Sequence, residues 1–217
     1  MPRWIGVDGM TNIRDLGGWP LPGNRVVRQG LVYRSSEMNG HFELSDAGRR
    51  TLLDELNICT DLDFRSPVED PSPALDTQRV KWISAPILPY DSIAEEGYKP
   101  AFREVFQVFA DAVNYPIIFH CWGGADRAGT VAFLLNGLLG VRLEHLIQDF
   151  ELTSLSIWGE RSHQSMEFKN LLTALDLSGR WGPDMNGAIE AYVRSLDITD
   201  AEISAIRGQL ASDCPTG

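Results

Sequence analysis

Residues 115–140 read YPIIFHCWGGADRAGTVAFLLNGLLG, and this stretch decides the fold. The apolar run Ile117–Phe119 is short and uninterrupted, which predicts a strand buried inside a parallel sheet. Gly123 and Gly124 mark a loop, and an apolar segment of helical length then runs to Gly140, a residue type that ends helices. A strand, a glycine-containing loop and a helix in this order predict an anion-binding site. The reason is that the free N–H groups and the positive dipole end of the helix face the loop.

Two side chains in this stretch carry chemistry. Cys121 lies where backbone N–H groups and the helix dipole stabilise a thiolate, the nucleophilic form of cysteine. Arg127 can fold its planar guanidinium over the same loop and bind two oxygens of a phosphate group. Phosphoryl transfer needs such a pair, because it depends on positioning and on stabilising the charge of the equatorial oxygens.

Residues 120–127, His-Cys-Trp-Gly-Gly-Ala-Asp-Arg, resemble the H-C-x5-R signature of the cysteine-dependent protein tyrosine phosphatase superfamily. A C-x5-R spacing alone is often a chance match, but the preceding strand and histidine, Gly129 and the following helix make this one specific. The resemblance implies that Cys121 attacks phosphorus to form a phosphocysteine and that Arg127 binds the phosphate. A buried structural cysteine beside an unrelated arginine is the alternative.

A second segment, residues 11–18, reads TNIRDLGG. Its composition is that of a turn, in which Arg14 and Asp15 are solvated or paired with each other. It also resembles the N-x-R-D-L-G-G segment of a bacterial branch of the superfamily, the tyrosine and lipid phosphatases, in which this segment lies against the catalytic loop. Residues 33–35, Tyr-Arg-Ser, resemble a further stretch of that branch. The resemblance implies that Arg14, Asp15 and His120 support the loop from behind.

The leaving oxygen needs a proton, and a well-placed general acid contributes ~10²–10⁴-fold to the rate. Asp126 matches the aspartate of the H-C-x-x-G-K-D-R-T-G loop of the bacterial branch. Asp91 lies on a proline-flanked loop similar to the acid loop of other superfamily members. We favour Asp126 and keep Asp91 as the alternative acid; either carboxylate could instead cap loop or helix N–H groups. The phosphate is expected to bind Trp122, Gly123, Gly124, Ala125, Asp126 and Arg127, through their backbone N–H groups and the Arg127 side chain.

Two positions depart from the loop of that branch. Ala125 replaces its lysine, which removes a positive charge from the mouth of the site and argues against phosphoinositide substrates. Ala128 replaces the hydroxyl residue that usually follows the arginine and assists the cysteine as a leaving group. Thr130 is two positions further on and therefore lies on another face of the helix. We expect slow hydrolysis of the intermediate, and a phospho-binding module whose catalysis has decayed is an alternative function.

Other segments carry structural signals. Ser45 is a predicted N-cap for a helix of about a dozen residues, and Ala101–Val113 is a predicted amphipathic helix. Arg142–Ser154 predicts another helix. Thr199 begins a capping box for a terminal helix, and Asp213–Gly217 is predicted to be a frayed tail.

Three further expectations concern single residues and one polar region. Arg65 and Glu69 lie in a segment that resembles the D-L-R-x-x-x-E strand end of the family, and we expect them to form a structural ion pair. Cys59 lies on the apolar side of a predicted strand, so it is expected in the core; a redox partner for Cys121 is the alternative. Residues 156–184 are polar and form either a lid or two packed turns.

The composition is that of an ordinary soluble globular protein, with 217 residues, 43% hydrophobic and 23% charged. The formal net charge of −11 argues against nucleic acid or an anionic membrane as a main partner. Three scattered cysteines are too few for a disulfide framework or a zinc site, and we expect no metal and no cofactor. The N-terminus has no apolar signal core and no apolar run has membrane-spanning length, so we expect a bacterial protein of the cytoplasm.

These observations predict a single phosphatase domain over residues 1–217. The expected fold class is α/β: a three-layer sandwich, the protein tyrosine phosphatase fold, in which a mainly parallel sheet of about four to five strands has helices on both faces. The site is expected at the carboxyl end of the strand that carries His120.

The resemblance implies a phosphomonoester phosphatase of the protein-tyrosine or dual-specificity type. A small-molecule phosphatase that acts on nucleotide, sugar or inositol phosphates is the alternative, because Trp122 could stack on a base or a ring. The expected partner is therefore a phosphorylated protein or a small phosphate ester. We expect no stable membrane association, and the sequence does not predict the oligomeric state.

Overall fold

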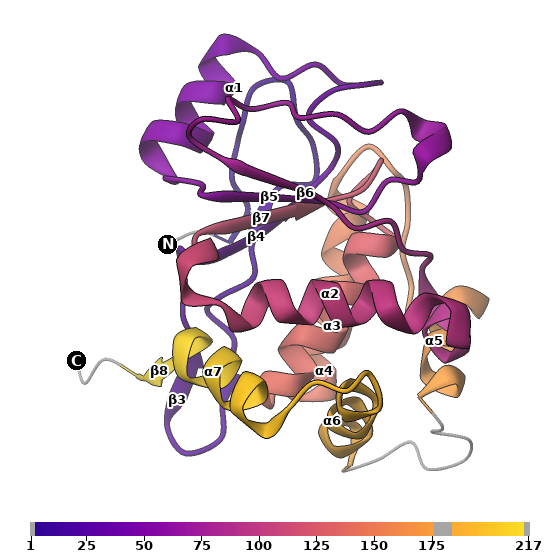
Figure 1. The fold of residues 1–217 in the computed structure, drawn as a ribbon. Helices are drawn as coiled ribbons and strands as arrows, with labels where there is room; N and C mark the ends of the chain where they lie inside the picture. Colours follow the sequence, from indigo (N-terminus) through magenta and orange to yellow (C-terminus); the bar gives the residue numbers. More distant parts are fainter. Residues whose placement is uncertain (1–2, 176–183, 215–217) are drawn as a thin grey trace.

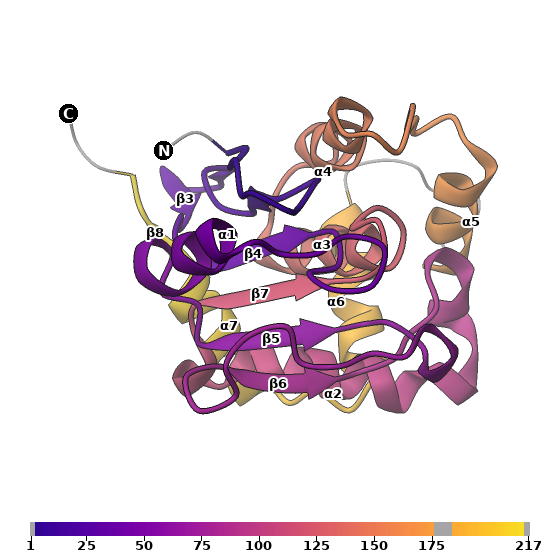
Figure 2. The same cartoon turned by 90° about the horizontal axis from the view of Figure 1, so that it is seen from above.

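The computed structural model describes residues 3–175 and 184–214. Its central sheet has five strands in the order β1–β4–β7–β5–β6; β1 pairs antiparallel with β4, and the other four are parallel. Figure 2 shows β4, β7, β5 and β6 side by side, with their arrowheads at the same edge. The predicted mainly parallel sheet is confirmed. Its strands are β1 (Arg14–Asp15), β4 (Val32–Ser35), β7 (Ile117–His120), β5 (Thr60–Asp63) and β6 (Lys81–Ser84).

The central strand β7 is buried on both faces. Ile117 and Phe119 belong to the larger apolar cluster of the molecule, and Ile118 belongs to the smaller one. This division follows from the alternation of side chains along a strand. An uninterrupted apolar run is therefore needed here, because neither face of the strand meets water.

Helices cover both faces of the central sheet, as predicted (Figure 1). One face carries α1 (Asp46–Arg50) and the π-helical turn η1 (Thr51–Glu55); the other carries α2, α3, α6 and α7. Helix α4 packs on α3, and α5 packs on the 3-10 turn η3. These elements are α2 (Lys99–Ala110), α3 (Arg127–Leu139), α4 (Leu143–Glu151), α5 (Met166–Ala174), α6 (Met185–Ser195), α7 (Asp200–Leu210) and η3 (Tyr90–Ala94).

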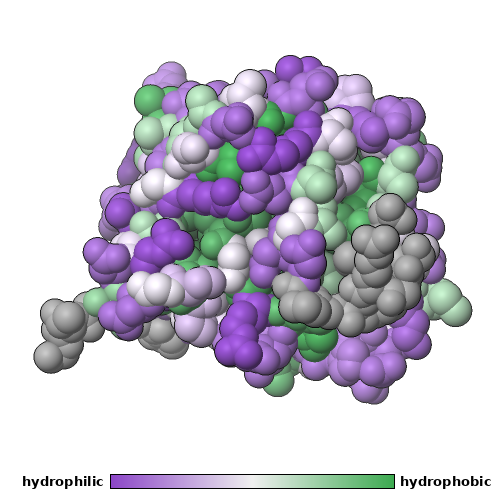
Figure 3. All heavy atoms as spheres, turned by 90° about the horizontal axis from the view of Figure 1, so that it is seen from below, coloured by the Kyte–Doolittle hydropathy of each residue, from purple (hydrophilic) through white to green (hydrophobic). Residues whose placement is uncertain are grey.

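Figure 3 shows the lower face of the view in Figure 1, where hydrophilic residues surround smaller apolar areas. Helices α6 and α7 contribute to this face, and both bury an apolar stripe against the larger cluster. The capping box of Thr199 and Glu202 begins α7 as predicted. The remaining 3-10 turns are η2 (Pro67–Glu69), η4 (Glu96–Tyr98), η5 (Ala112–Asn114) and η6 (Leu152–Leu155).

Several predicted helices end earlier than expected. Ser45 accepts a hydrogen bond from the Gly48 N–H as the N-cap, but the helix that follows changes from α1 to the π-turn η1. Helix α2 ends at Ala110, because Asp111 is extended and its carboxylate accepts a hydrogen bond from the Val113 N–H. Helix α4 likewise passes into η6 after Glu151. At Asp111 this competition from a short polar side chain is not visible in the apolar spacing alone.

A second, three-stranded antiparallel sheet was not predicted. It consists of β2 (Pro20–Leu21), β3 (Arg25–Val27) and β8 (Ala211–Asp213). The Cys214 N–H extends this pairing by donating to Asn24 O over 2.9 Å. The predicted frayed tail is therefore wrong for residues 213–214, since main-chain pairing orders them; residues 215–217 lie outside the described residues.

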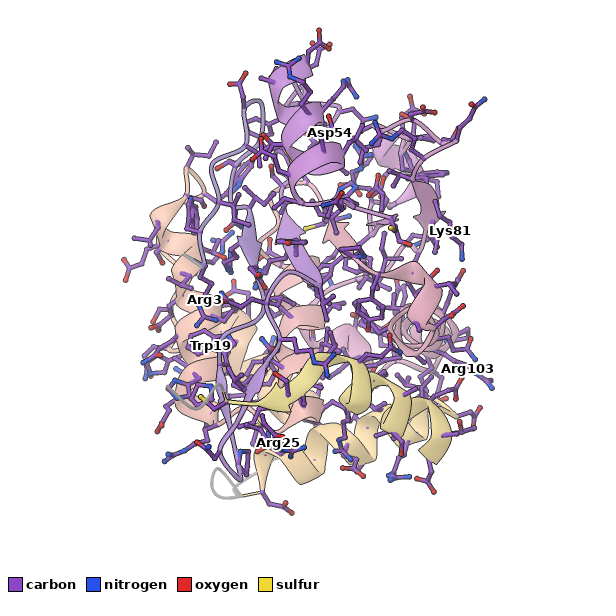
Figure 4. The ribbon with its side chains drawn as sticks, turned by 90° about the vertical axis from the view of Figure 1, so that its left-hand side faces the viewer. Arg3, Trp19, Arg25, Asp54, Lys81 and Arg103 are labelled. Carbon is purple, nitrogen blue, oxygen red and sulfur yellow. The ribbon has the colours of Figure 1, made fainter. Side chains whose placement is uncertain are left out.

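The N-terminal segment is attached to α4 through an aromatic ring. Figure 4 shows Arg3 beside Trp19, and the Arg3 Cζ atom is 3.5 Å from the Trp19 ring centroid. His145 of α4 stacks on the same ring, with centroids 5.1 Å apart and planes at 27°. This cation–π and stacking arrangement fixes the start of the chain near the smaller sheet.

Cys59 does not lie in the core as expected. It is exposed, whereas the neighbouring Ile58 is buried in the smaller apolar cluster. Strand β5 begins only at Thr60, and the Cys59 N–H donates to Pro116 O over 2.8 Å. The prediction was therefore wrong about Cys59: Ile58, and not Cys59, faces the core.

None of the helices in the described parts of the chain is both long and apolar enough to cross a bilayer.

Candidate active site

The Cys121 loop, residues 121–126, joins the end of β7 to the start of α3. It lies at the carboxyl edge of the sheet, because His120 is in register with Ser35 of β4 and Asp63 of β5. Open α/β sheets bind their ligands at this edge, and the site was predicted there. Cys121 itself is only 2% exposed, so its thiol lies at the base of the loop.

The carbonyl groups of the Cys121 loop are bonded on the outside of the loop. Trp122 O accepts from the Glu37 N–H, which follows β4, over 2.9 Å. Gly123 O accepts from the Asn12 side-chain amide over 2.9 Å. Two different segments of the chain therefore fix the first half of the loop.

Arg34 fixes the second half. Its Nη2 atom donates to Gly124 O over 2.7 Å and to Ala125 O over 3.2 Å. Arg34 is fully buried, so its charge lies directly beneath the loop. A buried guanidinium that donates to two successive carbonyls sets the orientation of both peptide planes.

These bonds determine where the loop N–H groups point. In a trans peptide the N–H and the C=O lie on opposite sides of the plane, so a carbonyl bonded outward directs the next N–H inward. The four outward carbonyls of residues 122–125 therefore direct the N–H groups of residues 123–126 into the loop. Within the described residues, none of these four N–H groups donates to another group of the protein. The loop is thus a ring of free donors, as an anion site requires.

Gly124 is required by this geometry. Its φ is +65°, and a Cβ atom at this position would lie 2.3 Å from Ser35 O. Any other residue would push the loop away from the end of β4. Gly123 leaves room for the Trp158 ring, which a Cβ atom would approach to 3.0 Å.

Arg127 is held by Glu69. Its Nη1 and Nη2 atoms donate to the two carboxylate oxygens of Glu69 over 2.6 and 2.8 Å. Burial lowers the pKa of Arg127, but the interactions of the guanidinium with Glu69 and Cys121 outweigh this effect and raise the pKa.

The expected Arg65–Glu69 ion pair is wrong. Turn η2 directs Glu69 toward Arg127, and its Oε2 atom also accepts from the Ser66 N–H and hydroxyl, each over 2.7 Å. Arg65 instead donates to Asp63 over 2.7 Å and to Glu37 over 3.2 Å. The two residues are close in sequence but belong to separate charged groups.

A buried layer of charge lies under His120. The His120 Nε2 atom is 3.0 Å from Asp61 Oδ1, and Nδ1 is 3.8 Å from Asp63 Oδ1. Burial lowers the pKa of His120, but the charges of the two aspartates exceed this effect and raise it. The His120 side chain is only 1% exposed and contacts Asp61 and Asp63 below the loop, so its supporting role stays a prediction.

A second buried group connects α4 to the loop. Asp149 receives Arg14 Nε over 3.2 Å and Arg34 Nη1 over 2.8 Å. Burial and the neighbouring Arg34 charge lower the pKa of Arg14 to about 10. Burial alone would raise the pKa of Asp149, but the two guanidinium groups lower it. Asp149 is thus the shared counter-ion of the two arginines.

The residues of segment 11–18 do different things. Arg14 Nη1 donates to Asn12 Oδ1 over 2.5 Å and so orients the amide that bonds Gly123 O. Arg14 therefore contacts the loop only indirectly, through Asn12. Asp15 instead accepts from the Gly17 and Gly30 N–H groups, each over 2.7 Å, and forms a turn away from the loop.

Asp126 and Asp91 lie in different surroundings. Asp126 is in the loop, and its side chain makes no capping bond to α3. Its Oδ1 atom accepts from the Tyr90 hydroxyl over 2.5 Å and is 3.7 Å from Arg161 Nη2. Asp91 is exposed and lines a separate cavity with Asn170, Thr173 and other residues near α5. The structure thus brings Asp126 into the loop and directs Asp91 toward α5.

Thr130 does not replace the hydroxyl that is missing at Ala128. Its Oγ1 atom accepts from the Tyr90 N–H over 3.0 Å and donates to Asp126 O over 3.0 Å. Both hydrogen bonds of the Thr130 hydroxyl are therefore made with Tyr90 and Asp126. Ala128 is fully buried beside the loop.

Aromatic side chains surround the mouth of the site. Trp122 is 43% exposed, and its ring is 5.3 Å from Trp158 and 5.0 Å from His41, between centroids. Phe42 packs against the edge of Trp158 at 5.6 Å. The part of region 156–184 around Trp158 and Arg161 therefore lies against the loop; residues 176–183 are outside the described residues.

Among the described residues, no three His, Cys, Asp or Glu side chains are arranged to hold a metal ion. The residues around the loop supply N–H groups, a guanidinium, a thiol and the partly exposed carboxylate of Asp126. Such a set can bind a tetrahedral oxyanion, attack it and transfer a proton.

A family model described as "Tyrosine phosphatase family" matches residues 5–212. The chain belongs to the tyrosine phosphatase family. The match includes the Cys121 loop, segment 11–18 and every element of the central sheet.

Two curated relatives of this chain are named as tyrosine-protein phosphatases. The chain is 33% identical over 172 residues to a protein of Cupriavidus necator named as a tyrosine-protein phosphatase, a match that covers 67% of this chain and 61% of the relative. It is 24% identical over 208 residues to the tyrosine-protein phosphatase of Nostoc commune, covering 77% of this chain and 70% of the relative. The first match thus spans less than two thirds of the relative's length.

One solved structure is also similar. It is the core catalytic domain of the PP-IP phosphatase SIW14 from S. cerevisiae, in complex with citrate, with a TM-score of 0.44 and 15% sequence identity. The similarity covers 76% of this chain and 98% of that chain.

Several supporting residues were not identified from the sequence. Asn12 and Arg34 lie in the two segments that resemble the bacterial branch, so the motifs carried a signal for them. Glu69 was singled out but given the wrong partner. Asp149 and Tyr90 had no local signal, because only the packing of α4 and η3 against the loop brings them there.

Proposed function

We propose that this chain hydrolyses phosphate monoesters through a phosphocysteine intermediate. The proposal rests on one observation above the others: the carbonyls of residues 122–125 are bonded outward, so a ring of free N–H groups surrounds Cys121. Such a ring stabilises the three equatorial oxygens of a transferring phosphoryl group.

The reaction has two steps. Cys121 Sγ attacks phosphorus, an S–P bond forms, and the bond from phosphorus to the ester oxygen breaks. The leaving oxygen takes a proton from Asp126. Water then attacks phosphorus, the S–P bond breaks, and inorganic phosphate leaves; Asp126, now ionised, accepts the proton of that water.

Arg127 has donors left for the phosphate. Glu69 takes one N–H from each terminal nitrogen of the guanidinium, so the Nε–H and the second N–H of Nη2 remain on another edge. These two donors form a fork that fits two oxygens of a phosphate. Glu69 thereby fixes the direction of this fork before the substrate arrives.

We propose aryl phosphates, and phosphotyrosine in proteins in particular, as the preferred substrates. Trp122 is 43% exposed on the loop itself, and Trp158 and His41 pack beside it. An aromatic leaving group gains contact with such rings. The two relatives named as tyrosine-protein phosphatases support the same class.

Small hydrophilic phosphate esters are the second candidate. A cavity of about 540 Å³ adjoins Asp126 and is lined by polar side chains that include Arg161, Ser162 and Ser165. A sugar or inositol phosphate could place hydroxyl groups there. A panel of phosphopeptides, phosphoinositides, nucleotides and sugar phosphates distinguishes the two classes by kcat/KM.

The decayed phospho-binding module is disfavoured by the geometry. Such a module needs no nucleophile and no acid, yet Cys121, Asp126 and Arg127 all lie around the ring of N–H groups. We further propose that the described elements act as one phosphatase domain, since both apolar clusters share the central sheet. The cytoplasmic location stays a prediction.

The decisive experiment is a comparison of wild type with Cys121→Ser. We expect the variant to fold, to lose turnover of 4-nitrophenyl phosphate and still to bind phosphate. Acid quenching of the wild-type reaction should trap a protein species heavier by one phosphoryl group, and this species should be missing in the variant. Turnover retained by Cys121→Ser would contradict the proposal.

A further inference from the structure

Tyr90 has a backbone conformation that bulky residues seldom adopt. Its φ is +60°, in the left-handed region, and the residue is 7% exposed at the start of η3. Such a conformation persists only where several contacts enforce it, and it is often found at functional sites. Here the Tyr90 N–H donates to Thr130 Oγ1 of α3 over 3.0 Å.

The side chain of Tyr90 ends at Asp126. Its hydroxyl donates to Asp126 Oδ1 over 2.5 Å, which is the length of a strong O–H to carboxylate bond. Burial and the charge of Asp126 raise the pKa of Tyr90, so the phenol keeps its proton. Tyr90 is therefore a permanent donor to one oxygen of Asp126.

The second group near Asp126 approaches the same oxygen. Arg161 Nη2 is 3.7 Å from Oδ1. Within the described residues, Oδ2 of Asp126 has no hydrogen-bond donor. One carboxylate oxygen is thus anchored by a donor that cannot accept its proton, and the other is open to solvent and substrate, since the side chain is 46% exposed.

We propose that Tyr90 is a positioning residue for proton transfer by Asp126, an inference that rests on the proposed function. By occupying Oδ1, Tyr90 confines the transferable proton to Oδ2 and holds that oxygen at the edge of the ring of N–H groups. When the P–O bond breaks, its electron pair stays on the leaving oxygen, which takes the Oδ2 proton. The Tyr90 hydroxyl and Arg161 then stabilise the carboxylate that remains.

Thr130 takes part in this arrangement. Its hydroxyl accepts from the Tyr90 N–H and donates to Asp126 O, so it connects the backbone of both residues. The left-handed conformation of Tyr90 aims the ring at Asp126 only while this connection holds. Thr130 therefore sets the position of Tyr90, as Tyr90 sets that of Asp126.

The test compares Tyr90→Phe with a matched control, Tyr115→Phe. Tyr115 is also a largely buried tyrosine, and its hydroxyl donates to Phe109 O over 2.6 Å, away from the loop. For Tyr90→Phe we expect kcat for alkyl phosphates to fall by ~10–10²-fold, part of the ~10²–10⁴-fold that a general acid supplies. For 4-nitrophenyl phosphate, whose leaving group hardly needs a proton, we expect less than about a threefold change. KM should stay constant, and Tyr115→Phe should match wild type with both substrates.

Two further variants keep the test decisive. Thr130→Val preserves shape but removes the acceptor of the Tyr90 N–H, and it should show the same selective loss if Tyr90→Phe does not fold. Tyr90→Phe added to Asp126→Asn should cause no further loss, because both changes remove one function. Equal losses with both substrates, or additive losses in the double variant, would overturn the inference. The proposed function is tested by a different result: turnover of 4-nitrophenyl phosphate by Cys121→Ser would contradict it, whatever Tyr90→Phe does.

Discussion

Glu69 and Arg127 form a bidentate salt bridge, with N···O distances of 2.6 and 2.8 Å. The pair lies 58 positions apart in the sequence and connects η2 to the first residue of α3. It removes the rotational freedom of the guanidinium before a phosphate binds. Preorganisation of this kind lowers the cost of binding the transition state.

We predict that Glu69→Gln lowers kcat/KM for 4-nitrophenyl phosphate by ~10–10²-fold, because an amide cannot hold both terminal nitrogens as acceptors. Inhibition by inorganic phosphate should weaken in parallel. Glu104→Gln, an exposed position on α2, is the control and should match wild type. Unchanged kcat/KM in Glu69→Gln would show that Arg127 finds its position without this pair.

The Glu69–Arg127 pair should also make the free energy of unfolding depend on pH in the acidic range. The Arg127 hydrogen bond lowers the pKa of Glu69 from its ordinary 4.5 to about 2. A lowered pKa stabilises the folded state above the ordinary value, and this contribution is lost as the pH falls from 4.5 toward 2. We therefore expect the difference in Tm between wild type and Glu69→Gln to narrow between pH 5 and about pH 3. If the difference in Tm between the two proteins does not change with pH, the loss of stability in Glu69→Gln comes from packing and not from the charge of Glu69.

The choice of general acid is tested by leaving-group dependence. Asp126→Asn should cut kcat for alkyl phosphates by ~10²-fold or more and spare 4-nitrophenyl phosphate, whereas Asp91→Asn should be nearly silent. The structure supports this order, because Asp126 lies in the Cys121 loop and Asp91 faces α5. The reverse pattern would move the role to Asp91.

Asp149→Asn should be strongly destabilising. Asp149 is the counter-ion of both Arg14 and Arg34, and removing one partner of a buried ion pair costs about 3–5 kcal/mol. Chemical denaturation measures this loss directly. Glu144→Gln, an exposed change on the same helix, should leave the free energy of unfolding within about 0.5 kcal/mol of wild type.

Arg34→Lys separates stability from loop geometry. Lysine keeps the charge opposite Asp149 but has one nitrogen in place of a planar fork, so it cannot also hold Gly124 O and Ala125 O. We expect a smaller loss of stability than in Asp149→Asn, together with weaker phosphate inhibition. Loss of stability without any change in phosphate binding would contradict the assigned role of Arg34.

Ala128→Ser should accelerate breakdown of the intermediate. The wild type lacks a hydroxyl there, and Thr130 is engaged by the Tyr90 N–H and by Asp126 O. We expect a pre-steady-state burst in wild type, and a higher steady-state rate with a smaller burst in the variant. Equal rates in both proteins would mean that hydrolysis of the phosphocysteine is not the slow step.

Local patterns predicted the central strand β7 and the Cys121 loop, whereas strand β1 lies in a segment that was predicted to be a turn. The short apolar run before Cys121 predicted a buried strand, and Gly124 predicted a turn at which φ is +65° and a Cβ atom would lie 2.3 Å from Ser35 O. These constraints lie within a few residues of one another. The spacing of Cys121 and Arg127 was therefore enough to predict a phosphate-binding site at this loop.

Partners that depend on tertiary packing could not be predicted in this way. Glu69 had a nearby arginine, Arg65, as its obvious partner, and only turn η2 directs it to Arg127. Asp149 lies on a helix whose apolar spacing gave no reason to expect a buried carboxylate. Main-chain pairing was missed for the same reason, since β8 pairs through backbone groups with a strand far earlier in the chain.

Strand β8 also has a consequence for truncated forms of the protein. It covers one side of β3, pairing Ala211 with Val27 and Asp213 with Arg25, while β2 covers the other side. Cutting the chain after Leu210 would leave the backbone donors and acceptors of β3 facing water along a short edge. An edge of three residues that includes the exposed Arg25 is too short to recruit other chains, so the shortened protein should lose stability without self-association, even with every residue of the Cys121 loop in place.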